Sequence, residues 1–185
     1  MPTVVVLVDP PVKDGVLTDL ADASPLSRAD AAALYEAMLA DVCETVQNGA
    51  GELLVNYRPD EQVPADVDSQ ARIADALAEE VPRPADVRYE VQVGERLAAR
   101  AGNTATHLLE TEGVDSVLLL EPTAAFLSRE TLGTATMKLR TRDAVVGPTI
   151  DGRVYMTGFV EPVDFENVFA PPAVETVVGR SRDAG

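Results

Sequence analysis

The sequence has 185 residues, 46% of them hydrophobic, which is enough for one globular domain with a sizeable core. Its 31 acidic residues outnumber its 15 basic residues, giving a formal net charge of −16, and the lack of a basic patch argues against binding to nucleic acid. The longest apolar runs, residues 4–8 and 117–120, are far too short to span a membrane, and the first residues lack the basic segment of a secretory signal, so we expect a cytoplasmic protein.

Apolar runs alternate with periodic segments along the chain. The runs are rich in β-branched residues and end near Pro, Gly or Asp, which is typical of buried strands. We expect strands at residues 3–8, 52–57, 87–92, 115–121, 143–149 and 153–159. We expect helices within residues 27–51, 68–81, 94–113, 128–141 and 172–181.

The first of these helices has the clearest signals. Ser27 and Asp30 have the spacing of a capping box, and Gly49 or Gly51 can end the helix. The apolar residues that recur every four positions are Leu34, Met38, Val42 and Val46. This row predicts the face that packs on the sheet.

The order of these elements predicts the fold class. Strands that alternate with helices favour a mostly parallel sheet covered on both faces, that is, a three-layer α/β/α fold with residues 1–185 as one domain. The last two strands are separated by a short Asp-Gly segment, which favours a hairpin and one antiparallel strand in a mixed sheet. Ligands of such folds bind beyond the carboxyl ends of the strands, which here lead into residues 9–25, 93–96 and 121–127.

The acidic residues are dispersed along the chain, and only two of the basic residues are lysines, Lys13 and Lys138. This composition resembles that of proteins from halophiles that accumulate salt. A solvated acidic surface is the ordinary interpretation, and a dedicated cation-binding surface is the alternative. Because the net negative charges repel one another in the folded chain, we expect its free energy of unfolding to rise as KCl is added.

Five segments, taken in order, resemble an uncharacterised glycosyltransferase-like family of the GT-A, nucleotide-diphospho-sugar transferase superfamily. The 2-phospho-lactate guanylyltransferases are a neighbouring family. The segments are "PPVKDGVLTDL", "AAALYEAMLADV", "VGERLAARAG", "DSVLLLEPTAAFLSRETL" and "AVVGPTIDGRVYMTGF". The resemblance, over about residues 3–170, implies a GT-A fold, a nucleotide or nucleotide-sugar ligand, and nucleotidyl- or glycosyl-transferase activity.

The first loop of the family resembles K-x-P-x-P-G-x-V-K-T-R-L, and its basic residues are expected to hold phosphates. In this chain Asp9, Leu17 and Asp19 stand at the two lysines and the arginine, and each lost cation forfeits about 1.5–3 kcal/mol of charge-assisted hydrogen bonding. The loop residues left for a nucleotide are Pro11, Lys13 and Thr18. The loop is either a remnant of a phosphate clamp or adapted to another ligand. If it is a remnant, restoring the three cations should strengthen nucleotide binding.

The exit of the fourth strand resembles the family's G-S-D-S-P-T-L-P, in which the Asp serves a divalent metal such as Mg²⁺ or Mn²⁺. Here the run is "EPTAAFLS", so that Thr123 takes the place of the Asp and Glu121 is the nearest substitute. Mg²⁺ on a nucleotide usually takes one or two carboxylates besides phosphate oxygens. Glu121 is therefore a candidate metal ligand, and a strand-end acid that faces solvent is the alternative.

Two other motifs are better retained. "VGERL" fits the family's L-G-E-R-M, in which Gly94 would let the backbone approach a base or sugar and Glu95 would accept its hydrogen bonds; an ordinary helix start is the alternative. "GPTIDGRVYMTGF" fits G-P-x-x-D-G-G-Y-Y-L-I-G, which implies Asp151 as a metal ligand or catalytic base, with Gly152 beside it. An ordinary Asp-Gly turn explains this motif equally well.

His107 and Cys43 are the single histidine and the single cysteine, so the chain offers neither an internal disulfide nor a His/Cys zinc site. We expect His107 to be an ordinary helix residue and Cys43 to lie in the core.

Two functions remain open. One is a transferase that acts on a nucleotide or nucleotide-sugar, and the other is a non-catalytic relative that serves as a binding partner or as a subunit of a homo-oligomer.

Overall fold

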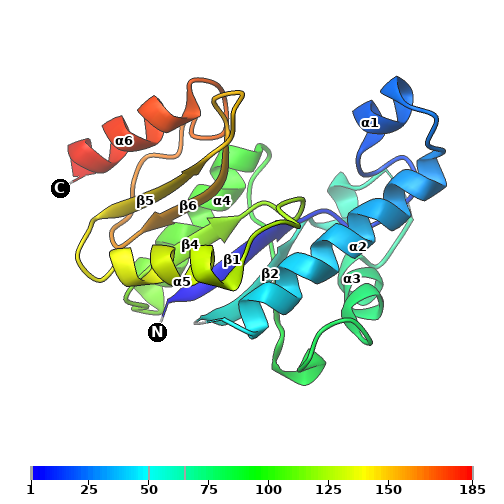
Figure 1. Ribbon diagram of the computed structural model, residues 1–185, viewed down its shortest axis with the longest axis horizontal. Helices are drawn as coiled ribbons and strands as arrows, with labels where there is room; N and C mark the ends of the chain where they lie inside the picture. Colours follow the sequence, from blue (N-terminus) through cyan, green and yellow to red (C-terminus); the bar gives the residue numbers. More distant parts are fainter. Residues whose placement is uncertain (1, 50, 65, 185) are drawn as a thin grey trace.

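The computed structural model describes residues 2–49, 51–64 and 66–184. Six strands form one sheet, and helices cover both of its faces (Figure 1). The strands are β1 Thr3–Val8, β2 Glu52–Tyr57, β3 Arg88–Val91, β4 Val117–Leu120, β5 Ala144–Pro148 and β6 Val154–Phe159. The helices are α1 Thr18–Ala23, α2 Arg28–Gln47, α3 Ser69–Leu77, α4 Leu97–Thr106, α5 Arg129–Lys138 and α6 Ala173–Ala184. Two 3-10 turns, η1 Asp60–Gln62 and η2 Pro84–Asp86, and a π-helical turn, η3 His107–Thr111, complete the described elements.

The strand order is β3-β2-β1-β4-β6-β5. Strands β1 to β4 are parallel, with β1 paired to both β2 and β4, and β2 paired to β3. Strand β6 runs antiparallel to both of its neighbours, β4 and β5. The mixed, mostly parallel sheet that the sequence predicts is therefore confirmed, and so is the late hairpin.

Side chains alternate between two apolar layers along the central strand. Val4, Val6 and Val8 pack with α2, α3 and α5, whereas Val5 and Leu7 pack with α4, α6 and the segment that follows β6. All six residues of β1 are buried, as expected for a parallel strand that is covered on both sides. Within the described part of the chain, no helix is both long enough and apolar enough to cross a membrane.

Helix α2 begins at the predicted capping box, in which the Asp30 N–H donates to the Ser27 hydroxyl at 3.1 Å and the Ser27 N–H donates to the Asp30 carboxylate at 3.2 Å. The predicted buried face is wrong at its first residues, because Leu34 is 38% exposed and Met38 is partly exposed. Most of the buried side chains are Ala31, Tyr35, Leu39, Val42, Cys43 and Val46. In a helix with 3.6 residues per turn, residues four apart are separated by about 400°, which is about 40° more than a full turn. Successive residues of the predicted row therefore point in gradually different directions. Val46 faces the core, and the residues of the row before it face it less and less until Leu34 is exposed.

Helix α1 lies inside the segment that the sequence predicts as a loop. It begins after Leu17, whose φ of 48° is left-handed, and none of its residues is buried. Figure 1 shows α1 away from the sheet, beyond the N-terminal end of α2. Arg28 of α2 forms an ion pair with Asp22 of α1 at 2.6 Å, which holds α1 beside the N-terminal end of α2. The same guanidinium lies 3.6 Å from Asp14 in the preceding loop.

Candidate functional site

A row of polar side chains begins where three parallel strands end. Asp9, Arg58 and Gln92 directly follow β1, β2 and β3, and they stand in register because the preceding residues are paired. The Arg58 N–H donates to the Val8 carbonyl at 3.0 Å, and the Gln92 N–H donates to the Tyr57 carbonyl at 2.7 Å, so the backbone ladder fixes both residues. The row therefore lies at the carboxyl edge of the sheet, where ligands of this fold class bind.

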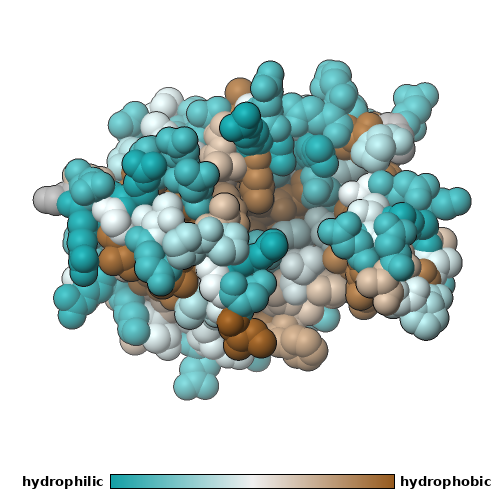
Figure 2. Space-filling model, turned by 90° about the horizontal axis from the view of Figure 1, so that it is seen from above, coloured by the Kyte–Doolittle hydropathy of each residue, from teal (hydrophilic) through white to brown (hydrophobic). Residues whose placement is uncertain are grey.

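Two hollows open at this edge, and they share Glu121 and Thr123. The Arg100 hollow has a volume of about 230 Å³ and lies between the strand ends and α4, with Asp9, Gln92 and Arg100 in its wall. The Tyr155 hollow has a volume of about 400 Å³ and lies between Tyr155 and residues 123–127. Figure 2 looks down on the molecule from above and shows a recess with hydrophobic residues at its floor, between the side that carries α6 and the lobe that carries α1.

Arg100 is the cation of the first hollow, and its side chain is held by neutral groups. The residue is only 7% exposed. Its Nε donates to the Gln92 side-chain carbonyl at 2.6 Å, and its Nη1 donates to the Glu95 backbone carbonyl at 3.0 Å. Burial, followed by the neighbouring Arg58 charge, lowers the pKa of Arg100, while Asp9 raises it. Because an arginine remains charged at neutral pH, this arrangement leaves a cation that is only partly compensated.

A buried polar network holds Gln92 and thereby Arg100 in place. The Gln92 amide donates to the Asn56 backbone carbonyl at 2.7 Å, and the Thr104 hydroxyl donates to the Asn56 side-chain oxygen at 3.0 Å. The Asn56 amide donates to the Glu90 carbonyl at 3.2 Å. The network joins β2, β3 and α4, so the guanidinium has a fixed orientation at the wall of the hollow.

Arg58 adds a second cation beside Asp9. Its Nη1 is 3.5 Å from the Asp9 carboxylate, and its Nε is buried without a hydrogen-bond partner among the described residues. The Asp9 N–H donates to the Tyr35 hydroxyl at 3.0 Å. Burial, followed by the Asp9 charge, raises the pKa of Tyr35, so its phenol stays neutral. A buried donor without an acceptor is costly, so Arg58 is held beside Asp9 at some cost to stability.

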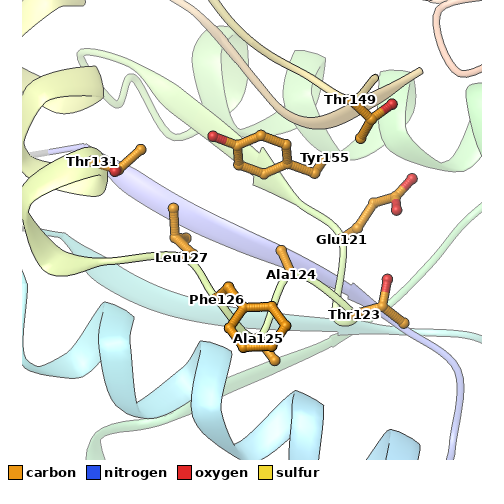
Figure 3. A pocket seen from close by; sticks show the side chains of 9 residues that line it. All are labelled: Glu121, Thr123, Ala124, Ala125, Phe126, Leu127, Thr131, Thr149 and Tyr155. Carbon is orange, nitrogen blue, oxygen red and sulfur yellow. The ribbon is translucent and has the colours of Figure 1, made fainter. Parts of the chain in front are cut away.

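The Tyr155 hollow has a polar end and an apolar body. In Figure 3 the side chains of Glu121 and Thr149 lie near each other at one end, and the Tyr155 ring lies opposite the loop that carries Ala124 to Leu127. The Glu121 N–H donates to the Tyr155 carbonyl at 3.0 Å, which continues the pairing of β4 with β6 to the floor of this hollow.

The three predicted phosphate-loop residues lie apart from both hollows. Pro11 is buried, Lys13 is exposed, and Thr18 is the first residue of α1, and none of them is part of the lining of either hollow. Asp9 is the residue of this loop that the Arg100 hollow contains. A nucleotide contact at Pro11, Lys13 or Thr18 stays a prediction.

Gly94 and Glu95 form the turn between β3 and α4. Gly94 has a φ of 132°, a conformation that a residue with a side chain rarely adopts, and its carbonyl accepts a hydrogen bond from the Gln62 amide at 3.1 Å. The Glu95 side chain is exposed, and it is its backbone carbonyl that contacts Arg100. The turn thus positions the arginine, and a direct contact of Gly94 or Glu95 with a ligand stays a prediction.

Glu121 and Asp151 differ in their surroundings. Glu121 borders both hollows, and burial raises its pKa, with a smaller lowering by Arg153 and a smaller raising by Asp151. The exposed Asp151 carboxylate accepts hydrogen bonds from the Thr149 hydroxyl and, at 3.4 Å, from the Arg153 N–H. The Thr149 hydrogen bond is the largest cause of its lowered pKa. Gly152 follows with a φ of 80°, so a turn accounts for the motif, and roles for Asp151 and Gly152 at a ligand stay predictions.

A divalent cation fits this edge only together with a ligand. Residues 2–49, 51–64 and 66–184 contain no group of three or more Asp, Glu, His or Cys residues that could hold an ion. Asp9 and Glu121 are the two carboxylates of the Arg100 hollow. Because Mg²⁺ is commonly held by one or two carboxylates and by the phosphates of a substrate, this donor set suits a cation that arrives with a phosphate.

The family model described as "Uncharacterized protein conserved in bacteria (DUF2064)" matches residues 42–171, which is more than half of the chain. This chain belongs to the DUF2064 family. Among curated proteins, no significant match to the sequence is found.

Solved structures show the fold of this DUF2064 protein. The crystal structure of a "putative nucleotide-diphospho-sugar transferase" from Desulfovibrio desulfuricans G20 aligns over 98% of this chain and 78% of its own length, with a TM-score of 0.76 and 23% sequence identity. A 4-diphosphocytidyl-2C-methyl-D-erythritol synthase aligns over 97% of this chain and 86% of its own length, with a TM-score of 0.53 and 14% identity. The α/β fold of nucleotide-diphospho-sugar transferase structures is thereby confirmed, and at these identities the likeness extends to the fold alone.

Sequence reasoning did not single out Arg58 or Arg100, although both leave a signal. Arg58 directly follows a predicted strand at the ligand-binding end of the sheet. Arg100 and Thr104 lie four residues apart on the buried face of α4, and Leu108 of η3 continues this row. A charged residue on a buried helix face is an informative exception, because arginine is seldom buried without a partner.

Proposed function

We propose that this DUF2064 protein binds a nucleotide or nucleotide-sugar at the carboxyl edge of its sheet and transfers a nucleotidyl or glycosyl group from it to an acceptor. The observation that carries the proposal is Arg100, a buried cation with neutral hydrogen-bond partners that faces the Arg100 hollow. The likeness of the fold to a nucleotide-diphospho-sugar transferase structure supports it.

In this proposal Arg100 and Arg58 hold the phosphate oxygens in place of the cations that the first loop lacks. A charge-assisted hydrogen bond from either guanidinium contributes about 1.5–3 kcal/mol. Asp9 and Glu121 oppose a bare anion, since both line the same hollow. A divalent cation bound with the phosphate would neutralise part of its charge beside these carboxylates.

The second candidate function is binding without transfer. It is favoured by Thr123 at the position where the related motif has its metal-binding Asp, and by the engagement of Asp151 with Thr149 and Arg153 in its own turn. In this case the chain would keep the ligand hollow and act as a binding partner or as a subunit of a homo-oligomer.

A nucleotide panel tests the binding step. Thermal unfolding is measured in about 2 M KCl, where exposed charges are screened, with nucleoside triphosphates, guanosine nucleotides and nucleotide-sugars, each with and without Mg²⁺ or Mn²⁺. We expect at least one ligand to raise the Tm of wild type, and to raise the Tm of Arg58→Gln much less. The control is Arg142→Gln, which changes an exposed arginine outside the lining of the hollow and should respond like wild type. If no member of the panel raises Tm, the proposal fails.

A turnover assay separates the two candidate functions. Release of pyrophosphate from a bound triphosphate indicates nucleotidyl transfer, and release of a nucleoside diphosphate from a nucleotide-sugar indicates glycosyl transfer. We expect one of these in wild type and a loss in Glu121→Gln, which removes the carboxylate that both hollows share. If wild type binds the nucleotide tightly but releases no more pyrophosphate or nucleoside diphosphate than Glu121→Gln does, the non-catalytic function is identified.

A further inference from the structure

The Tyr155 hollow is chemically one-sided. Of the nine residues that line it, Glu121 alone carries an acidic or basic group other than the phenol of Tyr155. The remaining side chains offer methyl groups, rings and hydroxyls. Arg153, two residues before Tyr155, is largely exposed and has its Nε 3.4 Å from the Asp151 carboxylate. An anionic group in the hollow would therefore meet Glu121 without a cation in the lining to pair with.

One large apolar side chain of the lining is uncovered, and a second belongs to the residue next to the lining. Phe126 belongs to its lining and is fully exposed to solvent. Ile150, next to the lining residue Thr149, is also fully exposed. A ligand with an apolar body would remove part of the Phe126 side chain from water, and burial of apolar surface favours binding.

We propose that the Tyr155 hollow takes an uncharged or cationic molecule that has an apolar body and a hydroxyl or amino group. The body lies between the Tyr155 ring and residues 124–127, and the hydroxyl or amino group is directed to Glu121 and Thr149. That this molecule is the acceptor of a transfer rests on the proposed function, whereas its chemical class rests on the lining of the hollow. The class does not include a phosphorylated acid such as the 2-phospho-lactate that names the neighbouring guanylyltransferases.

Three probes of similar shape and different charge test this inference. Benzylamine, benzyl alcohol and benzoate are titrated into ¹⁵N-labelled protein, and amide shifts of Ala124, Ala125 and Tyr155 report occupancy of the hollow. We expect benzylamine and benzyl alcohol to shift these amides and benzoate to bind at least about tenfold more weakly, because of its repulsion from Glu121. Benzoate binding that equals or exceeds that of benzyl alcohol would overturn the proposal.

Three variants show where and how the probes bind. Ala125→Trp fills the hollow and should abolish the shifts from benzylamine and benzyl alcohol, whereas Ala78→Trp, at an exposed position after α3, should leave them unchanged. Because Glu121 attracts a cation, we expect benzylamine to bind wild type more tightly than benzyl alcohol does. Glu121→Gln should remove this difference and keep the alcohol bound. Retained binding in Ala125→Trp would place the probes elsewhere and overturn the assignment.

The same spectra separate this inference from the proposed function. A nucleotide should shift the amides of Gln92 and Arg100, which lie on the other hollow. If the probes behave as expected but no nucleotide shifts those amides, the proposed function fails and the ligand class of the Tyr155 hollow stands. If a nucleotide shifts them while benzoate is the preferred probe, the proposed function stands and the ligand class is wrong.

Discussion

The loop after β1 and the wall made by Arg58 and Arg100 border the same edge of the sheet, but they carry opposite charge. The loop contributes Asp9 to the Arg100 hollow, and α4 contributes the Arg100 guanidinium. Arg58, which follows β2, lies outside the lining and reaches the hollow through Asp9, 3.5 Å from its Nη1. The charge that a ligand meets is therefore set by segments about 50 and 90 residues further along the chain. A count of charges within one loop cannot determine the sign of the potential at a site that several loops build.

The acids of the first loop also differ from one another in what they face. Arg28 draws Asp14 and Asp22 toward the N-terminal end of α2, and α1 carries Asp19 away from the sheet. Asp9 alone borders the hollow. The four predictions that follow use this difference, starting with the largest expected effect.

Replacement of Arg100 should have the largest effect. Arg100→Gln removes the buried cation and leaves the Glu95 carbonyl without its donor, so we expect nucleotide binding to weaken roughly 10- to 100-fold and the free energy of unfolding to fall by about 1–3 kcal/mol. Calorimetric titration and urea unfolding measure the two effects, with Arg142→Gln as the control. A folded variant with an unchanged Kd would show that the arginine serves structure alone.

Asp9→Asn should act in the opposite direction. It removes a carboxylate from the hollow and frees the Arg58 guanidinium from a contact at 3.5 Å, so nucleotide binding without a divalent cation should tighten about 3- to 10-fold. Titrations with and without Mg²⁺ measure the change, and Asp14→Asn is the matched control because Asp14 faces Arg28. If binding in Mg²⁺ is lost while the metal-free affinity is unchanged, Asp9 holds a cation and is not a source of repulsion.

Restoring the family's cations at positions 17 and 19 should change nucleotide affinity little. Leu17→Lys combined with Asp19→Arg places charge at the start of α1, away from the hollow, and we expect nucleotide affinity to change less than about threefold. The sequence pattern by itself predicts a larger gain, so the same titration compares the two views. A tenfold gain would mean that the loop closes over the ligand.

The smallest effect should appear in the pH dependence of stability. Burial raises the pKa of Glu121 above its ordinary value of 4.5, so the folded state holds this proton more tightly than the unfolded state does. Wild type therefore loses stability relative to Glu121→Gln as pH rises through the range just above 4.5, and the difference is constant at neutral pH. Unfolding at about pH 4 and pH 7 should show the variant to be the more stable protein only at pH 7. Equal differences at both pH values would contradict a raised pKa.

Most of the sheet is predictable from this sequence because its central strands, such as β1 and β4, are compact apolar runs. Residues 153–159 are expected as a strand, for example, and β6 is Val154–Phe159. The helix expected within residues 94–113 departs from the α-helical pattern at His107, where the Glu112 N–H bonds to the His107 carbonyl at 3.1 Å, and no periodicity signals such a π turn. Helix α1 is not predicted because none of its six residues is buried, so its sequence shows no apolar face with helical periodicity.

The site is only partly predictable because its parts meet through tertiary structure. Glu121 can be found from the rule that ligands bind at strand ends, and the structure brings it to both hollows. The Asp-Gly sequence at Asp151 is compatible both with an ordinary turn and with a metal ligand. Only the contacts of the Asp151 carboxylate distinguish these two interpretations. The role of Arg100 depends on Gln92, Glu95 and Arg58, and no local spacing relates Arg58 to the other three.

The position of β6 between β4 and β5 has a consequence for the order of assembly. The β5–β6 hairpin can form from contacts that are close in sequence, but β6 must then add to β4, which lies beside β1. Residues of the loop after β4, of α5 and of this hairpin together enclose the Tyr155 hollow, so the hollow exists only after the hairpin has added to β4. A ligand in it would fasten the hairpin to the sheet, and amide hydrogen exchange along β6 should then slow more than exchange along β2.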